Sequence, residues 1–559
     1  MSGILKKNGR SMFTDLNIGR KKFLKLLGGV GISLLGGVSI FKVLKNSKSF
    51  PFKGKIHGAN YKFGHLLREA ISEQPEEQES IDTLIIGGGI SGLSAGWWFQ
   101  KNNYQNYKIL EMEDHTGGNS SSGENDVSKY PWGAHYVPLP GKSAEYVRDL
   151  FQELGIINGY KNNKPIYDEY FLCADPHDRL FFQGRWQEGL VPSGGVSENE
   201  TLEYSQFFEF ISILKQKIGN DGKPIFNIPL ELSSRDPEYL QLDTISMSDF
   251  MKSRGWTSKH LLWYVNYCCR DDYGVSLENV SAWAGLHYFA SRVGEGMNTD
   301  SQSVVTWPEG NGWLSNQLSK INSGKIQTNT LVYKIHFRDT DGYGVDTISP
   351  SGAKKRYLVN HIIFAGPRYS ASRVIEGYDL KYHEDLLFSP WLIANITLSE
   401  RPGGKGAPLS WDNVSFYSES LGYIFANHQD LTFNRRSGVI TYYLPLDENR
   451  PLDKDSLKEI RKNVLQKKYE DWIELILPDL EKMHPGISDF ILSIDLWIWG
   501  HGMVSPGIDY LWNSKRSKML EPFRGIEFAH SDMSGISVFE EAQYRGCEAA
   551  KKILRKIKV

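Results

Sequence analysis

Three glycines have the spacing that lets a protein backbone approach a nucleotide diphosphate. Gly87, Gly89 and Gly92 form the pattern G-x-G-x-x-G, with Ile90 and Ser91 inside it. The first glycine permits a tight turn, the second admits the diphosphate, and the third lets a helix pack closely on a strand. The start of that helix directs free N–H groups at the phosphates. The pattern predicts a dinucleotide-binding site in which these five residues contact the cofactor.

Two strands and a helix are expected to position this turn. The apolar run 84–86 predicts a buried strand before the glycines, and a helical pattern begins directly after them. A second predicted strand, 107–110, ends at Glu111. An acidic residue about 20 residues after the glycine turn accepts hydrogen bonds from a ribose. The glycine pattern therefore stands in the strand–turn–helix context that makes it informative.

A glycine doublet follows the second strand. Gly117 and Gly118 come a few residues after Glu111, and Asn119 is next. The order of these motifs resembles the two-dinucleotide-binding-domain flavoproteins of the flavin amine oxidase and phytoene desaturase type. The resemblance implies FAD, bound in part by Gly117, Gly118 and Asn119. It also implies an α/β fold, with a Rossmann-like FAD-binding domain interleaved with an α+β substrate domain. The family usually has Arg where this chain has Asn119, so one positive charge near the phosphates is missing.

The same resemblance extends to four later segments. It implies that one segment lies along the flavin ring, that a valine backbone binds adenine, and that a strand ending in A-x-P passes the dinucleotide. It further implies an acidic residue at the ribityl-phosphate end, followed by a helix whose N-terminus points at the flavin. The residues at these positions are Gly133, Ala134, His135 and Tyr136; Val332; Ala365 and Gly366; Asp532; and Val538, Phe539 and Glu540.

Three ring side chains are candidates for contact with the reacting atoms. The family places an aromatic residue from the region 496–503 against the flavin, so Trp499 or His501 could form that wall. His135 is a candidate base because imidazole titrates near neutral pH. The structural alternative for each is a packed core residue or a β-turn. A lysine near the flavin is frequent in amine oxidases of this type, and the sequence does not place one.

Length and composition exclude several classes of protein. A chain of 559 residues exceeds a single core, so two or more domains are expected. The net charge of −2 gives no sign of a nucleic-acid partner, and the four cysteines show neither metal-ligand spacing nor a disulfide framework. The predicted division is a signal or anchor at 1–45, a linker at 46–79, FAD-binding parts at 80–145, 301–374 and 491–559, and substrate-domain parts at 146–300 and 375–490.

The N-terminus has the layout of an export signal. Basic residues precede the apolar run 26–41, and residues 19–25 resemble a twin-arginine signal with Lys21 in place of the second Arg. The run is shorter than the roughly 20 residues of a membrane span, and no clear cleavage site follows it. We expect a protein of the periplasm or the outer face of the cytoplasmic membrane, with residues 20–45 as an anchor if uncleaved. The alternative is an ordinary helix near the N-terminus.

These features predict an exported FAD-dependent oxidoreductase. An amine-type small molecule would transfer a hydride to flavin N5, and oxygen or another acceptor would then take the electrons. One alternative is an isoprenoid or carotenoid-type desaturase or isomerase on the same fold, and another is a non-catalytic flavin-binding scaffold. An acidic, aromatic pocket would favour the amine, and a wide apolar channel the desaturase. Residues 270–272 could bind a charged substrate or could form a paired or solvated cluster.

Overall fold

A computed structural model of the chain describes residues 50–69, 71, 74–338, 342–379, 385–430, 436–447 and 451–557. The chain divides into two compact units, Met1–Pro51 and Phe52–Val559, and every element named below belongs to the second. The predicted signal at 1–45 and the membrane association through 20–45 lie outside the described residues. Among the described helices, none is both long enough and apolar enough to cross a bilayer.

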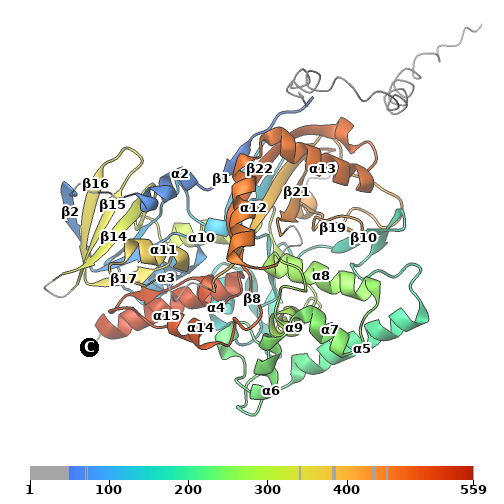
Figure 1. Cartoon of the computed structure of the whole chain (residues 1–559), viewed down its shortest axis with the longest axis horizontal. Coiled ribbons are helices and arrows are strands. Elements are labelled where there is room, and N and C mark those ends of the chain that lie inside the picture. The colour runs from blue at the N-terminus through green and yellow to red at the C-terminus, as the bar shows by residue number, and fades with distance from the viewer. Residues whose placement is uncertain are drawn as a thin grey trace, which may run out of the picture. The chain divides into compact units, whose positions relative to one another are not determined.

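A parallel five-stranded sheet forms the nucleotide-binding part, with strands in the order β13-β4-β3-β17-β23 (Figure 1). The central strand β3 is buried along its whole length, which is why it reads as an apolar run in the sequence. Ile85 faces one side of the sheet, and its neighbours Leu84 and Ile86 face the other. The strands are β3 (Thr83–Ile86), β4 (Tyr107–Leu110), β13 (Ile326–Gln327), β17 (His361–Phe364) and β23 (Glu527–Phe528).

Helices cover one side of this sheet and a second sheet covers the other. The helices on the Ile85 side include α3, α10 and α15, whose apolar side chains join one core cluster with Ile85. The second sheet has the order β14-β15-β16-β2, and its core joins Leu84 and Ile86. These elements are α3 (Ile90–Lys101), α10 (Gly312–Ile321), α15 (Phe539–Ile557), β14 (Leu331–Phe337), β15 (Tyr343–Ile348), β16 (Lys354–Val359) and β2 (Glu77–Ser80).

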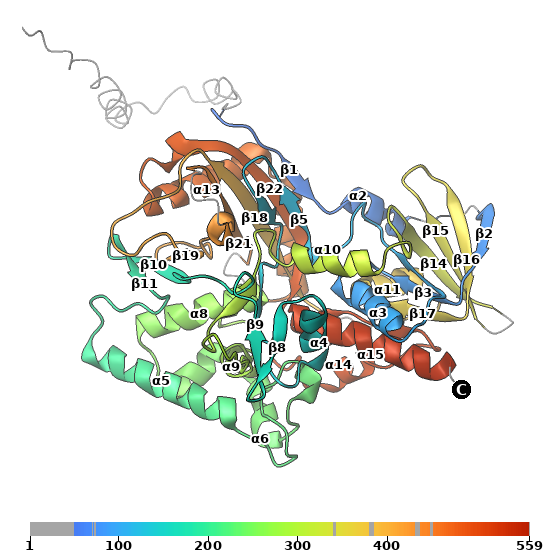
Figure 2. The ribbon, with the colours of Figure 1, turned by 180° about the vertical axis from the view of Figure 1, so that it is seen from behind.

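An eight-stranded mixed sheet forms the other part, in the order β1-β22-β18-β21-β20-β19-β10-β11 (Figure 2). On β21, Tyr443 joins the core cluster with α5, α7, α8 and α9, whereas the hydroxyl of the neighbouring Tyr442 bonds Asp479 of α13 at 3.0 Å. Successive residues of a strand point to opposite faces, so α13 and the α8–α9 layer lie on opposite sides.

The elements of this part come from distant stretches of the chain. Its strands are β1 (Ile56–Gly58), β10 (Asp178–Phe182), β11 (Arg185–Glu188), β18 (Phe388–Leu398), β19 (Asp412–Ser415), β20 (Tyr423–Phe425), β21 (Gly438–Pro445) and β22 (Ile491–Val504). Its helices include α5 (Glu198–Gln216), α7 (Met247–Ser253), α8 (Lys259–Tyr273), α9 (Ala282–Ala290), α12 (Lys454–Gln466) and α13 (Tyr469–Met483).

The structure corrects three sequence-based boundaries. The predicted linker 46–79 contains β1 and most of β2, because edge strands are held by backbone hydrogen bonds and need few apolar side chains. The predicted domain boundary at 491 is wrong, since β22 belongs to the eight-stranded sheet. The apolar residues between 454 and 477 recur at helical spacing and predict one continuous amphipathic helix. In the structure this stretch is divided between α12 and α13, with a break at residues 467–468. The four cysteines are free and buried.

Candidate active site

The glycine turn lies at the carboxyl edge of the parallel sheet. Gly87 has a φ of 111°, which glycine adopts without strain. A Cβ atom at Gly92 would lie 1.9 Å from the carbonyl oxygen of Gly87, so only glycine lets the helix begin this close to the turn. A Cβ atom at Gly89 would meet no described atom within 4 Å. The turn therefore leaves open space beside Gly89, as a bound diphosphate requires.

Glu111 and the glycine doublet border the same turn. The carboxylate of Glu111 accepts hydrogen bonds from the N–H groups of Gly88 at 2.6 Å and Glu113 at 2.8 Å. Burial raises the pKa of Glu111, while these N–H groups lower it. The N–H of Gly117 donates to the carbonyl of Gly88 at 2.9 Å, and Gly118 has a φ of 56°. The predicted ribose-binding carboxylate and the doublet are thus brought to one edge.

Four further predicted contacts surround this edge. A Cβ atom at Gly87 would lie 2.9 Å from the carbonyl of Ala365 and 3.0 Å from the nitrogen of Gly366. Val332 lies on β14, the edge strand of the second sheet, so one side of its backbone faces away from β15. Asp532 is buried just after β23, and one of its carboxylate oxygens accepts the backbone N–H of Arg368 at 3.1 Å. The fold therefore brings together residues separated by more than 400 positions in the chain.

The segment 133–136 runs between the doublet and β22. The N–H of Ala134 donates to the carbonyl of Asn119 at 3.0 Å, and a Cβ atom at Gly133 would lie 2.4 Å from that oxygen. The indole N–H of Trp499 donates to the carbonyl of Trp132 at 2.6 Å. Asn119 and Trp499 therefore hold this segment from two sides. Trp499 therefore lies beside the backbone that, by the family resemblance, is predicted to run along the flavin ring.

Desolvation by the surrounding chain lowers the pKa of the half-buried His135 to about 4. It also lowers the pKa of His501, although that residue is exposed at the surface of the described chain. The ring of His135 lies 4.7 Å from that of Tyr443, and the ring of His501 lies 4.7 Å from that of Tyr369. A histidine with such a pKa is neutral at pH 7 and a weaker base than proton transfer at that pH favours. The packing of both rings fits an aromatic wall better than a general base.

The final helix begins beside the end of β22. The N–H of Val504 donates to the hydroxyl of Ser537 at 3.2 Å, and Val538 accepts the first helical hydrogen bond of α15. Glu540 is buried in the first turn, and one of its carboxylate oxygens has no partner within the described part of the chain. Burial raises the pKa of Glu540 to about 7, while Arg292 lowers it. The predicted residues Val538, Phe539 and Glu540 thus start the helix next to β22.

A group of acidic and aromatic side chains adjoins Tyr136. The hydroxyl of Tyr136 donates to the carboxylate of Asp271 at 3.5 Å and accepts the guanidinium of Arg292 at 3.3 Å. Arg292 also holds both oxygens of Asp272, at 2.7 and 3.0 Å. Asp271 itself forms no ion pair with a described residue. Burial, and then the charge of Asp272, raise the pKa of Asp271 to about 7.

A further carboxylate extends this group toward β19. Asp412 accepts a hydrogen bond from the hydroxyl of Tyr267 at 3.1 Å. Burial and the neighbouring carboxylates of Asp271 and Asp178 raise the pKa of Asp412 well above its usual range. Arg292 is the basic side chain of this group, and it pairs with Asp272. The carboxyl groups of Asp271 and Asp412 therefore have no cation of their own among the described residues. We call Asp271, Asp272, Asp412, Arg292 and Tyr136 the acidic group.

Sequence reasoning identified this group only in part. Arg270, Asp271 and Asp272 were recognised as a cluster, and two of them are paired, since Arg270 meets Asp447 at 3.3 Å and Asp272 meets Arg292. The adjacent acidic residues were the available signal for Asp271. The approach of Asp412 and Tyr136 to Asp271 depends on long-range folding and has no local signature.

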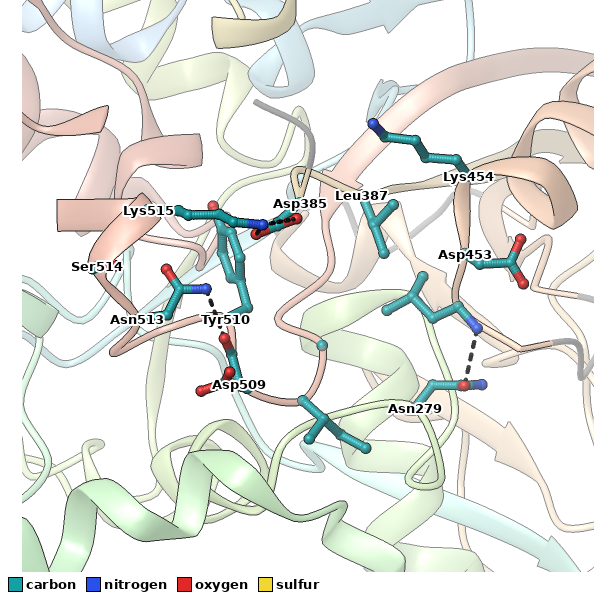
Figure 3. Close-up of a pocket in the computed structure, with 13 residues that line it drawn as sticks. Asn279, Asp385, Leu387, Asp453, Lys454, Asp509, Tyr510, Asn513, Ser514 and Lys515 are labelled. Carbon is teal, nitrogen blue, oxygen red and sulfur yellow. Dashed lines mark hydrogen bonds and ion pairs between the residues drawn. The ribbon is translucent and has the colours of Figure 1, made fainter. Parts of the chain in front are cut away.

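A separate pocket of about 650 Å³ lies between the starts of α12 and α14 (Ser514–Met519) (Figure 3). Lys515 pairs with Asp385 across it at 2.9 Å. Tyr510 lines the pocket and donates through its hydroxyl to the carbonyl of Asp532 at 3.3 Å. The pocket is connected to the cofactor edge through Tyr510, and its lining includes none of the predicted cofactor residues.

Comparison with known proteins agrees with this arrangement. Residues 85–154 match the NAD(P)-binding Rossmann-like domain. The chain is 21% identical to the oxidoreductase PigB of Serratia sp., over 85% of this chain and 75% of that protein. It is also 21% identical to a probable flavin-containing monoamine oxidase A of Dictyostelium discoideum, over 69% of this chain and 78% of that protein.

Solved structures show the same fold. A structure of putrescine oxidase bound to putrescine superposes with a TM-score of 0.61 at 14% identity, covering 86% of this chain and all of that one. The chain therefore has the mixed α/β fold of that amine oxidase structure, with a Rossmann-like dinucleotide-binding part. The predicted fold class is confirmed.

Proposed function

We propose that this protein is an FAD-dependent oxidoreductase that oxidises a cationic amine. The observation that carries the amine assignment is the acidic group beside residues 133–136. The carboxylates of Asp271 and Asp412 lack an ion-pair partner among the described residues. Desolvation and the neighbouring carboxylates raise the pKa of both groups. A protonated amine would supply the missing positive charge. Aromatic side chains favour the same class of ligand, since ring faces attract cations.

The residues at the sheet edge fit FAD. The space at Gly89, the left-handed glycines Gly87 and Gly118, and the carboxylate of Glu111 match the needs of a diphosphate and a ribose. FAD bound there would supply a two-electron acceptor for a hydride from the carbon that bears the amine. Val332, Asp532 and the start of α15 would contact its adenine, ribityl and flavin ends, as the family resemblance implies.

The chain's own side chains would orient the amine and exclude water. Asp271 would hold the ammonium group, with Tyr136 fixing the position of its carboxylate. His135 and Tyr443 would line one wall, because their rings lie 4.7 Å apart and Tyr443 is anchored through its hydroxyl to the carbonyl of Gly133 at 2.9 Å. A closed aromatic site strengthens the attraction between the carboxylate and the ammonium.

The alternatives receive less support. An isoprenoid or carotenoid substrate has no charge to balance Asp271 and Asp412, so those half-buried carboxylates would disfavour its binding. A non-catalytic flavin-binding scaffold would not require an acidic group beside the segment that is expected to contact the flavin.

Absorption spectroscopy tests this proposal. The purified protein, reconstituted with FAD if necessary, should absorb at about 370 and about 450 nm. Under anaerobic conditions, diamines, monoamines, amino acids and isoprenoids are added separately, and we expect only the cationic amines to bleach the 450 nm band. Bleaching by isoprenoids alone would favour the desaturase, and failure to bind FAD would contradict the whole proposal.

We also propose that the N-terminus directs export, on the basis of its basic and apolar sequence. Twin-arginine export carries folded proteins, which suits a protein that binds its cofactor before leaving the cytoplasm. Cell fractionation of the full chain and of a chain beginning at Phe52 tests this. We expect only the full chain outside the cytoplasm or on the membrane, and equal distribution of the two would contradict export.

A further inference from the structure

An N-terminal strap, residues 56–68, leaves the eight-stranded sheet and reaches the nucleotide-binding part. Its first strand, β1, pairs in parallel with β22, where Ile56 lies opposite Leu496. The 3-10 helix η1 (His65–Arg68) follows α2 (Tyr61–Gly64) directly. Both views place α2 between β1 and the nucleotide-binding sheet (Figures 1 and 2). The chain then forms β2, which pairs in parallel with β16.

The strap crosses the edge at which the dinucleotide is expected. The backbone N–H of Asn60 donates to both carboxylate oxygens of Glu113, at 2.9 and 3.1 Å. A Cβ atom at Gly64 would lie 3.2 Å from the sulfur of Met112, so α2 contacts the residues that follow Glu111. Leu67 packs in the core cluster that contains Leu110 and Ala371. The strap therefore extends from the end of β4 toward α11 (Arg368–Val374), which follows β17.

A pocket beside the strap marks the adenine side of this edge. Its volume is about 330 Å³, and Leu67 and Glu69 form one wall. Tyr333 and Lys334 form part of the other, immediately after Val332. The strap and the strand expected to bind adenine thus enclose space together.

The strap also brings a positive charge toward His501. Its helix η1 contacts α11, and the ring of Tyr369 on α11 lies 4.7 Å from the ring of His501. The side-chain amide of Asn119 donates to the carbonyl of Gly502, the neighbour of His501. After burial, the charges of Arg461 and then Arg68 contribute to the lowered pKa of His501. The side chain of Arg68 is exposed, and its guanidinium forms no hydrogen bond or ion pair with another described residue. Its guanidinium is therefore available to a ligand.

We propose that the strap closes the dinucleotide site and that Arg68 supplies the positive charge to the FAD diphosphate that Asn119 cannot. The inference rests on the proposed FAD cofactor. It explains how the chain can lack the arginine that usually follows the glycine doublet, since a guanidinium from another segment can make the same charge-assisted hydrogen bonds. Arg68 would be a binding residue and would not take part in the reaction.

Titration of the apoprotein with FAD, followed by flavin fluorescence, tests this inference. We expect Arg68→Gln to raise the Kd for FAD about tenfold, the effect of losing one charge-assisted contact. The Kd should also depend less on salt in this variant, because one cation that binds the diphosphate is gone. Lys62→Gln is the matched control, since Lys62 is exposed on the same strap, and its Kd should equal that of the wild type. Adding Asn119→Arg to Arg68→Gln should restore affinity.

The outcomes separate the two proposals. If the wild-type chain does not bind FAD, the proposed cofactor is wrong. If it binds FAD and Arg68→Gln binds equally well, or Lys62→Gln loses as much, the role of Arg68 is wrong. Amide hydrogen exchange on the full chain provides the second readout. Exchange of residues 59–68 should slow when FAD is added, and unchanged exchange would overturn the closure of the site by the strap.

Discussion

Gly89 offers a residue-scale test of the cofactor position. Its φ of −72° suits any residue, and a Cβ atom there would meet no described atom within 4 Å. We therefore expect Gly89→Ala to change the free energy of unfolding by less than about 0.5 kcal/mol. The methyl group would nevertheless occupy the space of the diphosphate and raise the Kd for FAD at least about tenfold. Denaturant unfolding and FAD titration measure the two effects, and a stable variant with unchanged affinity would place the diphosphate elsewhere.

Asp271 offers a residue-scale test of the substrate class. In Asp271→Asn we expect the KM for a cationic amine to rise about tenfold or more, because an amide cannot balance the ammonium charge. In the wild type, kcat/KM should rise as pH passes the Asp271 pKa of about 7 and the carboxylate forms. That rise should be absent from the pH profile of Asp271→Asn. A variant with an unchanged profile would remove Asp271 from substrate binding.

The same carboxyl group should make folding depend on pH. Folding raises the pKa of Asp271 from the usual 3.8 to about 7, so the folded state holds the proton more tightly than the unfolded state. The stabilisation from this proton is fully present below pH 3.8 and is lost as the pH rises through about 7. Asp271→Asn carries no such ionisation. The difference between the thermal midpoint of Asp271→Asn and that of the wild type should therefore be more positive at pH 8 than at pH 4. If Asp271→Asn is more stable than the wild type at pH 8 and binds substrate more weakly, then Asp271 serves substrate binding and lowers the stability of the fold.

At the scale of elements, the contact between α3 and α15 connects the glycine turn to the final helix. A Cβ atom at Gly546 would lie 2.1 Å from the carbonyl oxygen of Ser91 and 3.1 Å from the nitrogen of Ala95. We expect Gly546→Ala to destabilise the fold by about 1–3 kcal/mol, because the two helices would have to separate. Denaturant unfolding measures this. If residue 546 had free space around it, alanine would stabilise the fold, because alanine is more favourable than glycine inside a helix. A stabilised Gly546→Ala variant would therefore contradict the close contact between the two helices.

The strand β22 belongs to one part of the fold and serves the other. Its pairing with β18 places it in the eight-stranded sheet, while Trp499 and Gly502 bond the segments at Trp132 and Asn119. A strand with side chains on both faces can make such a connection. This dual role explains why a boundary at residue 491 looked reasonable from motif order and is wrong in the structure.

At the scale of the whole second unit, the candidate site collects short pieces of distant segments. Tyr136 comes from β7 (Tyr136–Pro138), Asp271 from α8, Asp412 from β19, and Arg292 from the segment that follows α9. The strap adds a further segment, from the start of the unit. The five-stranded and eight-stranded sheets therefore belong to one compact unit, Phe52–Val559.

The amino-acid sequence alone determined the nucleotide-binding turn. Gly87, Gly89, Gly92 and the strand ending at Glu111 were predictable because the tight turn and close helix start depend on local backbone geometry that few residues other than glycine allow. The fold class followed from the order of such local motifs. The strands β3, β4 and β17 were also recognisable, because buried strands are apolar along their length.

The tertiary structure decided what lies around that turn. No local pattern could show that Asp412 approaches Asp271, that Arg292 is engaged by Asp272, or that the strap carries Arg68 toward His501. Edge strands such as β1 were missed because backbone pairing leaves little trace in side-chain pattern. Charge balance and desolvation depend on distances between segments far apart in the chain. The sequence therefore predicted where a dinucleotide would bind, and only the folded chain showed which charged side chains lie near one another around that turn.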